Sequence, residues 1–242
     1  MPIGVIVNVL SVVGGGAIGA LAGNKLSMDF KEKLNLILGL CSMGMGISTI
    51  VLMQNMPAVI FSVIIGTAIG LVLHLGDRIN MVAQGMQKVI SKLIKDDRST
   101  GAQEEFIATL VTCIVLFCAS GTGIYGSIVS GMTGDHSILI AKSILDMFTG
   151  VIFACTLGAV VCIVAVPQFV IFFLLFLLAG IIYPATNEIM IADFKACGGF
   201  IMLATGFRMI KVKMFPVADM IPSMIIVMPL SALWVSIAEN ML

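Results

Sequence analysis

Long apolar runs separated by short polar connectors dominate the pattern of this chain. A helix that crosses a bilayer needs about 20 mostly apolar residues. We therefore predict about eight transmembrane helices, at residues 2–22, 34–53, 57–75, 106–128, 138–166, 167–184, 189–210 and 215–237. The first run lacks a basic n-region and an A-x-A cleavage site, which favours a retained span over a signal peptide.

The fifth run, 138–166, is too long for one straight crossing and contains two charged residues, Lys142 and Asp146. We expect a half-helix or re-entrant piece at 138–147, before a span that starts near Phe148. Several of the predicted helices are thus expected to be discontinuous.

Residues 77–95 have a different, amphipathic pattern. Apolar side chains share one stripe of the predicted helix and lysines lie opposite: Ile79, Val82, Met86, Val89, Ile90 and Leu93 against Lys88, Lys92 and Lys95. This pattern predicts a helix that lies on the membrane surface, with a calmodulin-like partner site as the alternative. Residues 96–104 are expected to be a connecting loop, and residues 1–242 a single membrane domain.

The composition agrees with an all-α membrane protein and excludes other classes. Hydrophobic residues make up 60% and charged residues 11% of the chain, whereas soluble proteins average about 25% charged residues. The 13 basic residues balance the 13 acidic ones, so we expect no nucleic-acid partner. Without metal-ligand spacing or a nucleophile elbow, we expect no enzyme activity, no metal and no cofactor.

The positions of the basic residues predict the orientation. Eleven of the 13 follow or close the first, third and seventh predicted spans, and the other two, Lys142 and Lys195, lie inside apolar runs. Because basic residues accumulate on the cytoplasmic side, we predict both termini outside and the 77–95 helix on the cytoplasmic face.

Glycines cluster in and beside the spans. Gly15, Gly19 and Gly23 form a small-xxx-small ridge that predicts close helix packing, within the protomer or across a homodimer or higher homo-oligomer. The "GGGAIG" match to a dinucleotide fingerprint lacks the strand that the motif requires.

Three other clusters mix glycine with hydroxyl residues, at 39–49, 119–127 and 195–206. Such mixtures favour broken helices, which are tolerated at membrane depth where they line a cavity; tight packing is the alternative. The neutral candidates for a substrate or ion site are Asn8 in the first span and Ser42, Ser48, Ser120, Thr122, Gly123, Tyr125 and Thr205 in later spans.

Two segments share a weak scheme of a glycine-containing span, a connector and a proline-led apolar run: "LCSMGMGIST…NMPAVIFSVII" and "FIMLATGFRMI…DMIPSMIIVM". The scheme relates spans two and three to spans seven and eight. It suggests an inverted repeat of spans 1–3 and 6–8, an architecture of many secondary transporters.

Ionisable residues inside spans mark pathways or ion pairs. Lys142 and Asp146 stand one helical turn apart, so they either neutralise each other or bind a solute and a coupling ion. Asp193 and Lys195 permit the same two interpretations.

A family likeness extends over nearly the whole chain. Four segments carry it: "GVIVNVLSVVGGGAIGALAG", "LILGLCSMGMGIS", "GIYGSIVSGMTGDHSILIAKSILD" and "ACGGFIMLATGFRMIKVK". The chain resembles the YdfK/YqgA-like bacterial membrane proteins, a family of unknown function. The resemblance implies a multi-pass protein of the bacterial inner (cytoplasmic) membrane, without an established substrate. The family-like positions are Asn8, Gly126, Gly134, Asp135, Lys142, Ser143 and Asp146.

The leading hypothesis is an ion-coupled secondary transporter of a small, anionic organic solute, with Na⁺ or H⁺ coupling. Its charged site residues would be Lys142, Asp146 and Lys195. One alternative is a passive channel assembled by oligomers through the ridge of Gly15, Gly19 and Gly23. The other is a non-transporting scaffold that binds lipid through the 77–95 helix.

Overall fold

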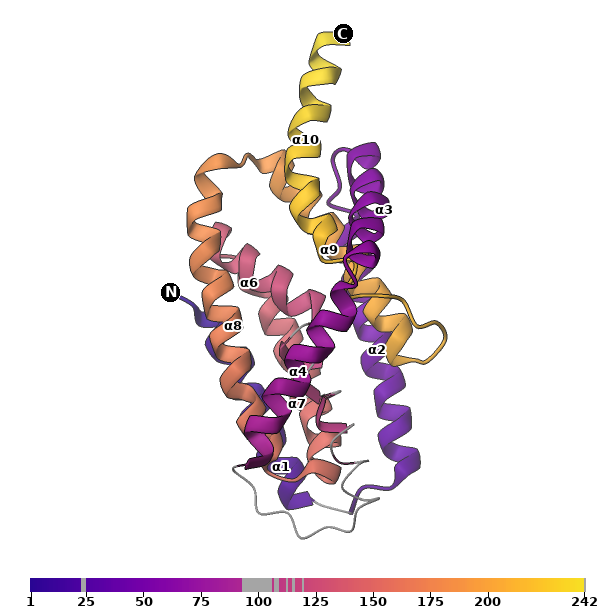
Figure 1. The fold of residues 1–242 in the computed structure, drawn as a ribbon, viewed down its shortest axis with the longest axis vertical. Helices are drawn as coiled ribbons and strands as arrows, with labels where there is room; N and C mark the ends of the chain where they lie inside the picture. Colours follow the sequence, from indigo (N-terminus) through magenta and orange to yellow (C-terminus); the bar gives the residue numbers. More distant parts are fainter. Residues whose placement is uncertain are drawn as a thin grey trace.

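The computed structural model describes residues 1–242 except 23–24, 93–105, 107–108, 112, 115, 119 and 242 (Figure 1). Within these residues the chain is helical and has no strand. The helices are α1 (Ile3–Ala22), α2 (Met28–Ile50), α3 (Met56–Val72), α4 (Leu75–Lys92), α6 (Gly121–Thr133), α7 (Ser137–Leu157), α8 (Val160–Ile182), η2 (Tyr183–Ala185), α9 (Glu188–Met209) and α10 (Pro222–Met241).

Six helical stretches among the described residues are long and apolar enough to cross a membrane. The bent pair of α3 and α4, with 59° between its halves, makes a seventh if it counts as one span. Residues Pro222–Ile237 of α10 form a shorter apolar helix. The protein is therefore a multi-pass, all-α membrane protein, while length and apolarity alone do not establish the predicted count of eight.

The boundary between the fifth and sixth predicted spans was misplaced at Pro167. The chain turns at Gly158, with a φ of 68°, and Pro167 lies inside α8. Glycine adopts this left-handed conformation at little cost, whereas proline is tolerated within transmembrane helices, where neighbours satisfy the freed backbone groups. The true boundary places residues 160–166 in α8.

The half-helix predicted at 138–147 is also wrong, because α7 runs without interruption from Ser137 to Leu157. Lys142 and Asp146 pair with each other on this helix, and the pairing allows a charged turn to stay helical inside the protein.

Of the three predicted breaks, only the one at 119–127 has a counterpart in the structure. Ser120 has an extended backbone and its Oγ accepts a hydrogen bond from the Gly123 N–H, so that α6 begins afresh there. The breaks predicted in α2 and α9 are absent. Ser48 of α2 and Thr205 of α9 bond to carbonyls of their own helices, those of Met45 and Ile201.

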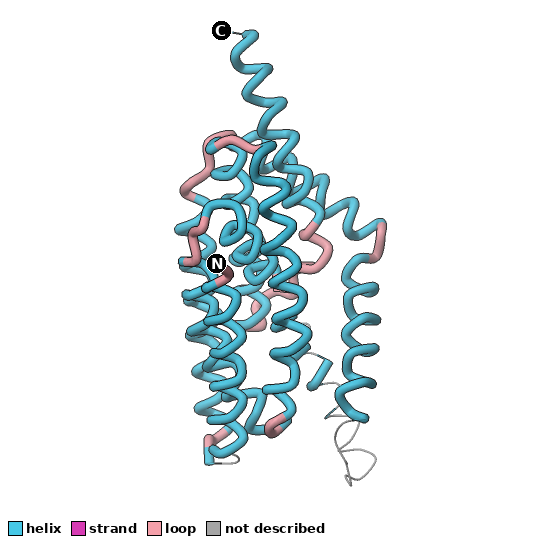
Figure 2. Tube along the Cα trace, turned by 90° about the vertical axis from the view of Figure 1, so that its left-hand side faces the viewer, coloured by secondary structure: helices cyan, strands magenta, loops and turns pink. Residues whose placement is uncertain are grey.

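The helices pack in pairs: α1 runs parallel to α7 and antiparallel to α8, α2 runs antiparallel to α9, and α3 runs antiparallel to α10 (Figures 1 and 2). Small residues allow the closest approaches. A Cβ added at Gly15 would lie 2.2 Å from the Met147 carbonyl oxygen, and one at Gly19 would lie 2.4 Å from that of Val151. The ridge was predicted to pack within the protomer or across an oligomer, and Gly15 and Gly19 face α7 of the same chain; Gly23 lies outside the described residues.

The crossing of α2 and α9 is reciprocal. A Cβ added at Gly46 would lie 2.7 Å from the carbonyl oxygen of Gly199, and one at Gly199 would lie 2.8 Å from that of Gly46. Gly39 and Gly206 face each other's carbonyls in the same way, at 3.1 and 2.7 Å. The glycines of these helices thus serve close packing instead of breaks.

The predicted amphipathic helix is α4, which ends at Lys92; Leu93, Lys95 and the loop 96–104 lie outside the described residues. Ala83 is buried, whereas Val82 and Val89 are exposed. The bend between α3 and α4 is held by Asp219, whose Oδ1 accepts a hydrogen bond of 2.8 Å from the Gly76 N–H.

Candidate functional site

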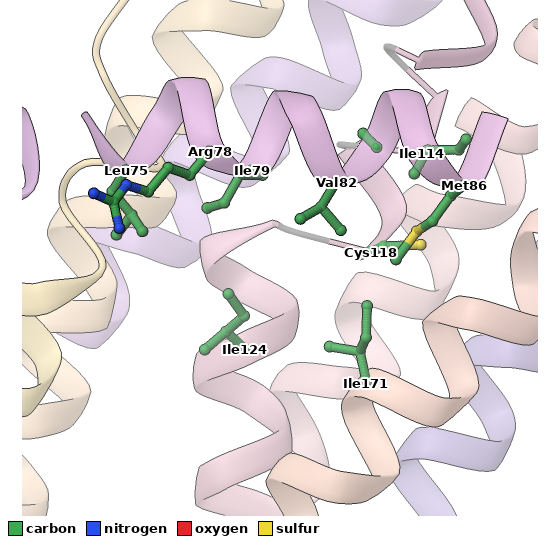
Figure 3. A pocket seen from close by; sticks show the side chains of 10 residues that line it. Leu75, Arg78, Ile79, Val82, Met86, Ile114, Cys118, Ile124 and Ile171 are labelled. Atoms are coloured by element: carbon green, nitrogen blue, oxygen red, sulfur yellow. The ribbon is translucent and has the colours of Figure 1, made fainter. Parts of the chain in front are cut away.

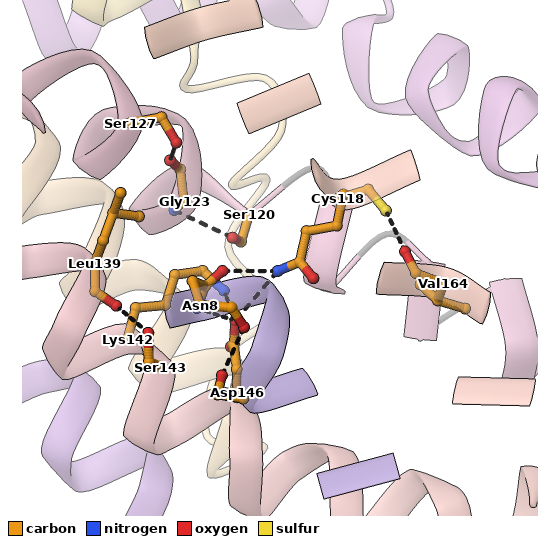
Figure 4. Close-up of polar contacts among 12 residues, drawn as sticks. Asn8, Cys118, Ser120, Gly123, Ser127, Leu139, Lys142, Ser143, Asp146 and Val164 are labelled. Carbon is orange, nitrogen blue, oxygen red and sulfur yellow. Dashed lines mark hydrogen bonds and ion pairs between the residues drawn. The ribbon is translucent and has the colours of Figure 1, made fainter. Parts of the chain in front are cut away.

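Four polar side chains from three helices meet inside the bundle (Figure 4). Asn8 comes from α1, Lys142 and Asp146 from α7, and Gln168 from α8. Asn8 and Gln168 have no exposed surface, and Lys142 and Asp146 are 3% and 6% exposed. We call these four residues the central cluster.

Asp146 Oδ2 is the acceptor on which the central cluster converges. Lys142 Nζ donates to it from one helical turn away, Asn8 Nδ2 donates over 2.9 Å, and Gln168 Nε2 approaches to 3.4 Å. Gln168 Nε2 also donates to Asn8 Oδ1 over 2.8 Å. The bonds join α1, α7 and α8 around a single ion pair.

Buried polar groups normally find hydrogen-bond partners, and the central cluster leaves one without. Gln168 Oε1 is buried and has no partner among the described residues. Lys142 also has donor capacity to spare, because an ammonium has three N–H groups and, among the described residues, Lys142 Nζ donates to Asp146 alone. Within the described part of the chain the cluster is therefore neutral overall and retains an unpaired acceptor and unpaired donors, which a polar ligand could engage.

The N-terminus of α6 lies beside the central cluster (Figure 4). Phe172 connects the two: its ring lies 5.7 Å from Lys142 Nζ, and a Cβ added at Gly123 would meet its Cζ at 2.1 Å. The first turn of a helix carries unpaired N–H groups and a partial positive charge. This end of α6 adds positive potential on the side of Lys142, which favours an anion.

The structure brings together three of the predicted site residues, Asn8, Lys142 and Asp146, and places Ser120 and Gly123 next to them. Thr122 and Tyr125 are buried on α6. Tyr125 packs against Phe194, with 5.8 Å between ring centroids, and its hydroxyl has no partner among the described residues.

The other neutral candidates belong to the crossing of α2 and α9. Ser42 donates to the Met202 carbonyl over 3.1 Å, while Ser48 and Thr205 bond to their own helices. None of these hydroxyls has a hydrogen bond to the central cluster in the described structure. Their assignment to a solute site stays a prediction.

Gln168 is the member of the central cluster that the sequence analysis missed. The sixth span was predicted to begin at Pro167, which put Gln168 at a membrane interface. Polar side chains are common at such an interface, so Gln168 was not singled out. The available signal was an amide in an otherwise apolar stretch from Val160 to Ile182.

Asp193 forms a second buried polar group, and its partner is not Lys195. Its Oδ1 accepts from the backbone N–H groups of Gln54 and Asn55, at 2.8 and 2.9 Å, and its Oδ2 accepts from Ser231 Oγ at 2.6 Å. The carboxylate therefore joins the α2–α3 connector to α9 and α10. With these acceptor positions occupied, its role is structural.

Lys195 pairs instead with Asp135, over 3.5 Å, in the connector between α6 and α7. Asp135 also accepts a hydrogen bond of 3.0 Å from the Ser137 N–H at the start of α7. The side-chain and backbone hydrogen bonds from Ser137, followed by the charge of Lys195, lower the pKa of Asp135 below its ordinary value of 3.8.

This lowered pKa predicts a pH dependence of stability. A carboxyl whose pKa is lower in the folded state contributes its full stability above the ordinary value, and that stability is lost as the pH falls through the folded pKa. The melting temperature in detergent should therefore fall less for Asp135→Asn than for the parent protein between about pH 5 and pH 3. The control is Asp77→Asn, whose carboxyl is exposed. Equal slopes for Asp135→Asn and the parent would contradict the expected contribution.

Comparison with known proteins agrees with the membrane architecture. Residues 3–232 match the model of a family described as "Protein of unknown function (DUF554)". The chain is 43% identical to "Uncharacterized protein YqgA" of Escherichia coli (strain K12), over 97% of this chain and 98% of that protein. It is 25% identical to "Uncharacterized membrane protein YdfK" of Bacillus subtilis (strain 168), over 92% and 93% of the two chains. No solved structure matches the chain.

Proposed function

Since this chain belongs to the DUF554 family, whose function is not established, we propose a function from its own geometry: ion-coupled secondary transport of a small, anionic organic solute. The observation that carries the proposal is the buried central cluster beside the N-terminus of α6, in which Lys142 is neutralised and Gln168 Oε1 has no partner among the described residues. Charged residues within a membrane domain are costly, and they commonly mark solute or ion pathways.

An inverted repeat of α1–α3 and α8–α10 would supply the architecture for transport. The reciprocal glycines support it, because Gly199 and Gly206 of α9 occur 160 positions after Gly39 and Gly46 of α2, the separation that also relates Asn8 to Gln168. The helices of each pair run in opposite directions in Figure 1.

Under that relation two hydrogen bonds join residues to their own equivalents: Asn8 with Gln168, and Ser42 with the carbonyl of Met202. A contact between equivalent residues lies on the two-fold axis that relates them. The central cluster would then sit on the repeat axis, the place where transporters with inverted repeats hold their solute.

Each polar group has a role in this proposal. Lys142 Nζ attracts the anionic group of the solute, and Gln168 Oε1 accepts a hydrogen bond from a hydroxyl group elsewhere on the solute. Asp146 balances Lys142 when the site is empty. When the solute binds, Asp146 is freed to take up a proton or Na⁺, which couples the two movements.

The distribution of basic residues supports the orientation within this proposal. Lys211, in the connector after α9, lies 3.6 Å from Glu32 near the start of α2, so these two segments lie on one side of the molecule. We assign that side to the cytoplasm, which places both termini outside the inner membrane. A homo-oligomer stays a prediction.

The test is uptake into proteoliposomes that contain a pH-sensitive dye, with acetate, lactate, succinate and citrate offered under proton and Na⁺ gradients. We expect saturable, gradient-dependent uptake of at least one acid. Gln168→Leu should reduce uptake of the hydroxy acids lactate and citrate by about tenfold or more, since the hydrogen bond from the solute hydroxyl to Gln168 Oε1 is lost. Gln54→Leu makes the same change at an exposed position and should have no effect. Ungated flux without saturation would instead indicate a passive channel.

A further inference from the structure

A cavity of about 340 Å³ lies between α4 and the helices α6 and α8 (Figure 3). It is distinct from the central cluster, none of whose four residues lines it. Val82 and Met86 of α4 face Ile124 of α6 and Ile171 of α8 across it. Apart from Arg78 the lining carries no charge, so the cavity offers nothing to orient a small polar solute inside it.

Arg78 stands at one end of this cavity, in the first turn of α4 (Figure 3). The residue is exposed, and its guanidinium forms no ion pair within the described part of the chain. A guanidinium matches the geometry of phosphate and carboxylate oxygens with two parallel hydrogen bonds. The cavity therefore combines an apolar interior with a cationic end, which fits an amphiphile with an anionic head.

We propose that this cavity holds one acyl chain of an anionic phospholipid from the surrounding bilayer, with the lipid phosphate on Arg78. The cavity volume is at the lower end of the range of about 300–1,000 Å³ found for small-ligand sites. This volume suits a single acyl chain and is too small for a folded peptide. Apolar cavities also tend not to hold water.

The position of α4 favours a bilayer lipid as the occupant. Val82 lines the cavity but is 58% exposed, and Val89 on the same helix is 63% exposed. In a membrane domain such surfaces meet lipid, so the cavity is continuous with the acyl-chain region. This lipid site stands independently of the transport function, because it uses none of the residues assigned to the solute.

The experiment uses the full-length protein in phosphatidylcholine nanodiscs with a phosphatidylglycerol probe that carries a photoreactive diazirine in its acyl chain. Mass spectrometry should place the label on α4 and on α8 near Ile171. Val82→Trp fills the cavity and should reduce labelling there by about fivefold or more. The indole ring takes the space of the lipid's acyl chain, so the methylenes of that chain are no longer buried in the cavity. Val89→Trp adds the same ring outside the cavity and should leave the labelling unchanged. Equal labelling of the two variants would overturn the proposal.

The head group is tested separately. Arg78→Gln should lower labelling by the phosphatidylglycerol probe more than labelling by the matching phosphatidylcholine probe, because choline offsets the phosphate charge, whereas Lys88→Gln should alter neither. Equal loss of both probes in Arg78→Gln would contradict an anionic head group at Arg78. Displacement of the probe by equimolar palmitate would show that a free amphiphile, and not a bilayer lipid, is the ligand. Melting temperatures in detergent confirm that each variant is folded.

Discussion

Replacing Asp146 by asparagine is expected to destabilise the protein by about 3–5 kcal/mol and to abolish transport. The change leaves Lys142, which is 3% exposed, as a buried charge without its counterion, and removal of one partner from a buried ion pair has a cost of this size. The free energy of unfolding in mixed micelles measures the first effect, and uptake into proteoliposomes measures the second.

A second variant separates structure from function. Replacing both charges, with Lys142→Met and Asp146→Leu, should recover part of the lost stability: the apolar pair has no desolvation penalty, although Asn8 Nδ2 loses its acceptor. Transport should remain absent. Thr67→Ala is the control, since the Thr67 hydroxyl bonds to the Val63 carbonyl of its own helix and is not a candidate for the solute site. If the double variant transports as well as the parent, the ion pair is purely structural and its proposed role is wrong.

Gly15→Ala is expected to destabilise the protein by about 2–4 kcal/mol, the size of effect produced by overpacking a core. Its new Cβ would lie 2.2 Å from the Met147 carbonyl oxygen. Since this atom belongs to the backbone of α7, no side-chain rotation can relieve the clash, and α1 must move away. The movement should also weaken the bond from Asn8 to Asp146, so transport should fall together with stability.

The neighbouring glycine provides a matched control. A Cβ added at Gly14 has no atom within 4 Å, so Gly14→Ala should stabilise α1 by up to about 1 kcal/mol through helix propensity alone. Unfolding in mixed micelles measures both variants. Equal effects at the two positions would mean that α1 and α7 are not packed as described.

These contacts change how the glycine ridge of α1 is interpreted. Gly15 and Gly19 face α7 within the same chain, so they are unavailable to assemble a pore from several copies. The channel hypothesis loses the surface on which it depended. Transport by a single chain retains its candidate site in the central cluster.

The pairing of Lys142 with Asp146 was predictable because their spacing of four residues on a helix brings them together whatever the rest of the fold does. Gln168 was not predictable in the same way. Its meeting with Asn8, 160 positions away, depends on where α8 begins, and proline at position 167 is compatible both with a helix start and with a helix interior. The turn at Gly158 decides between them.

The sequence by itself determined that this is an all-α membrane protein, because chains with such long apolar runs and so few charged residues are stable only in a lipid bilayer. It also determined the ion pair on one helix, which is a local property. Only the tertiary structure decided three contacts. The glycines of α2 and α9 allow these helices to pack closely, Asp193 accepts hydrogen bonds from the connector between α2 and α3, and Gln168 completes the central cluster. Each of these depends on a contact between distant segments, and in a membrane such contacts follow from the fit of small residues and hydrogen bonds between helices, which no local pattern specifies.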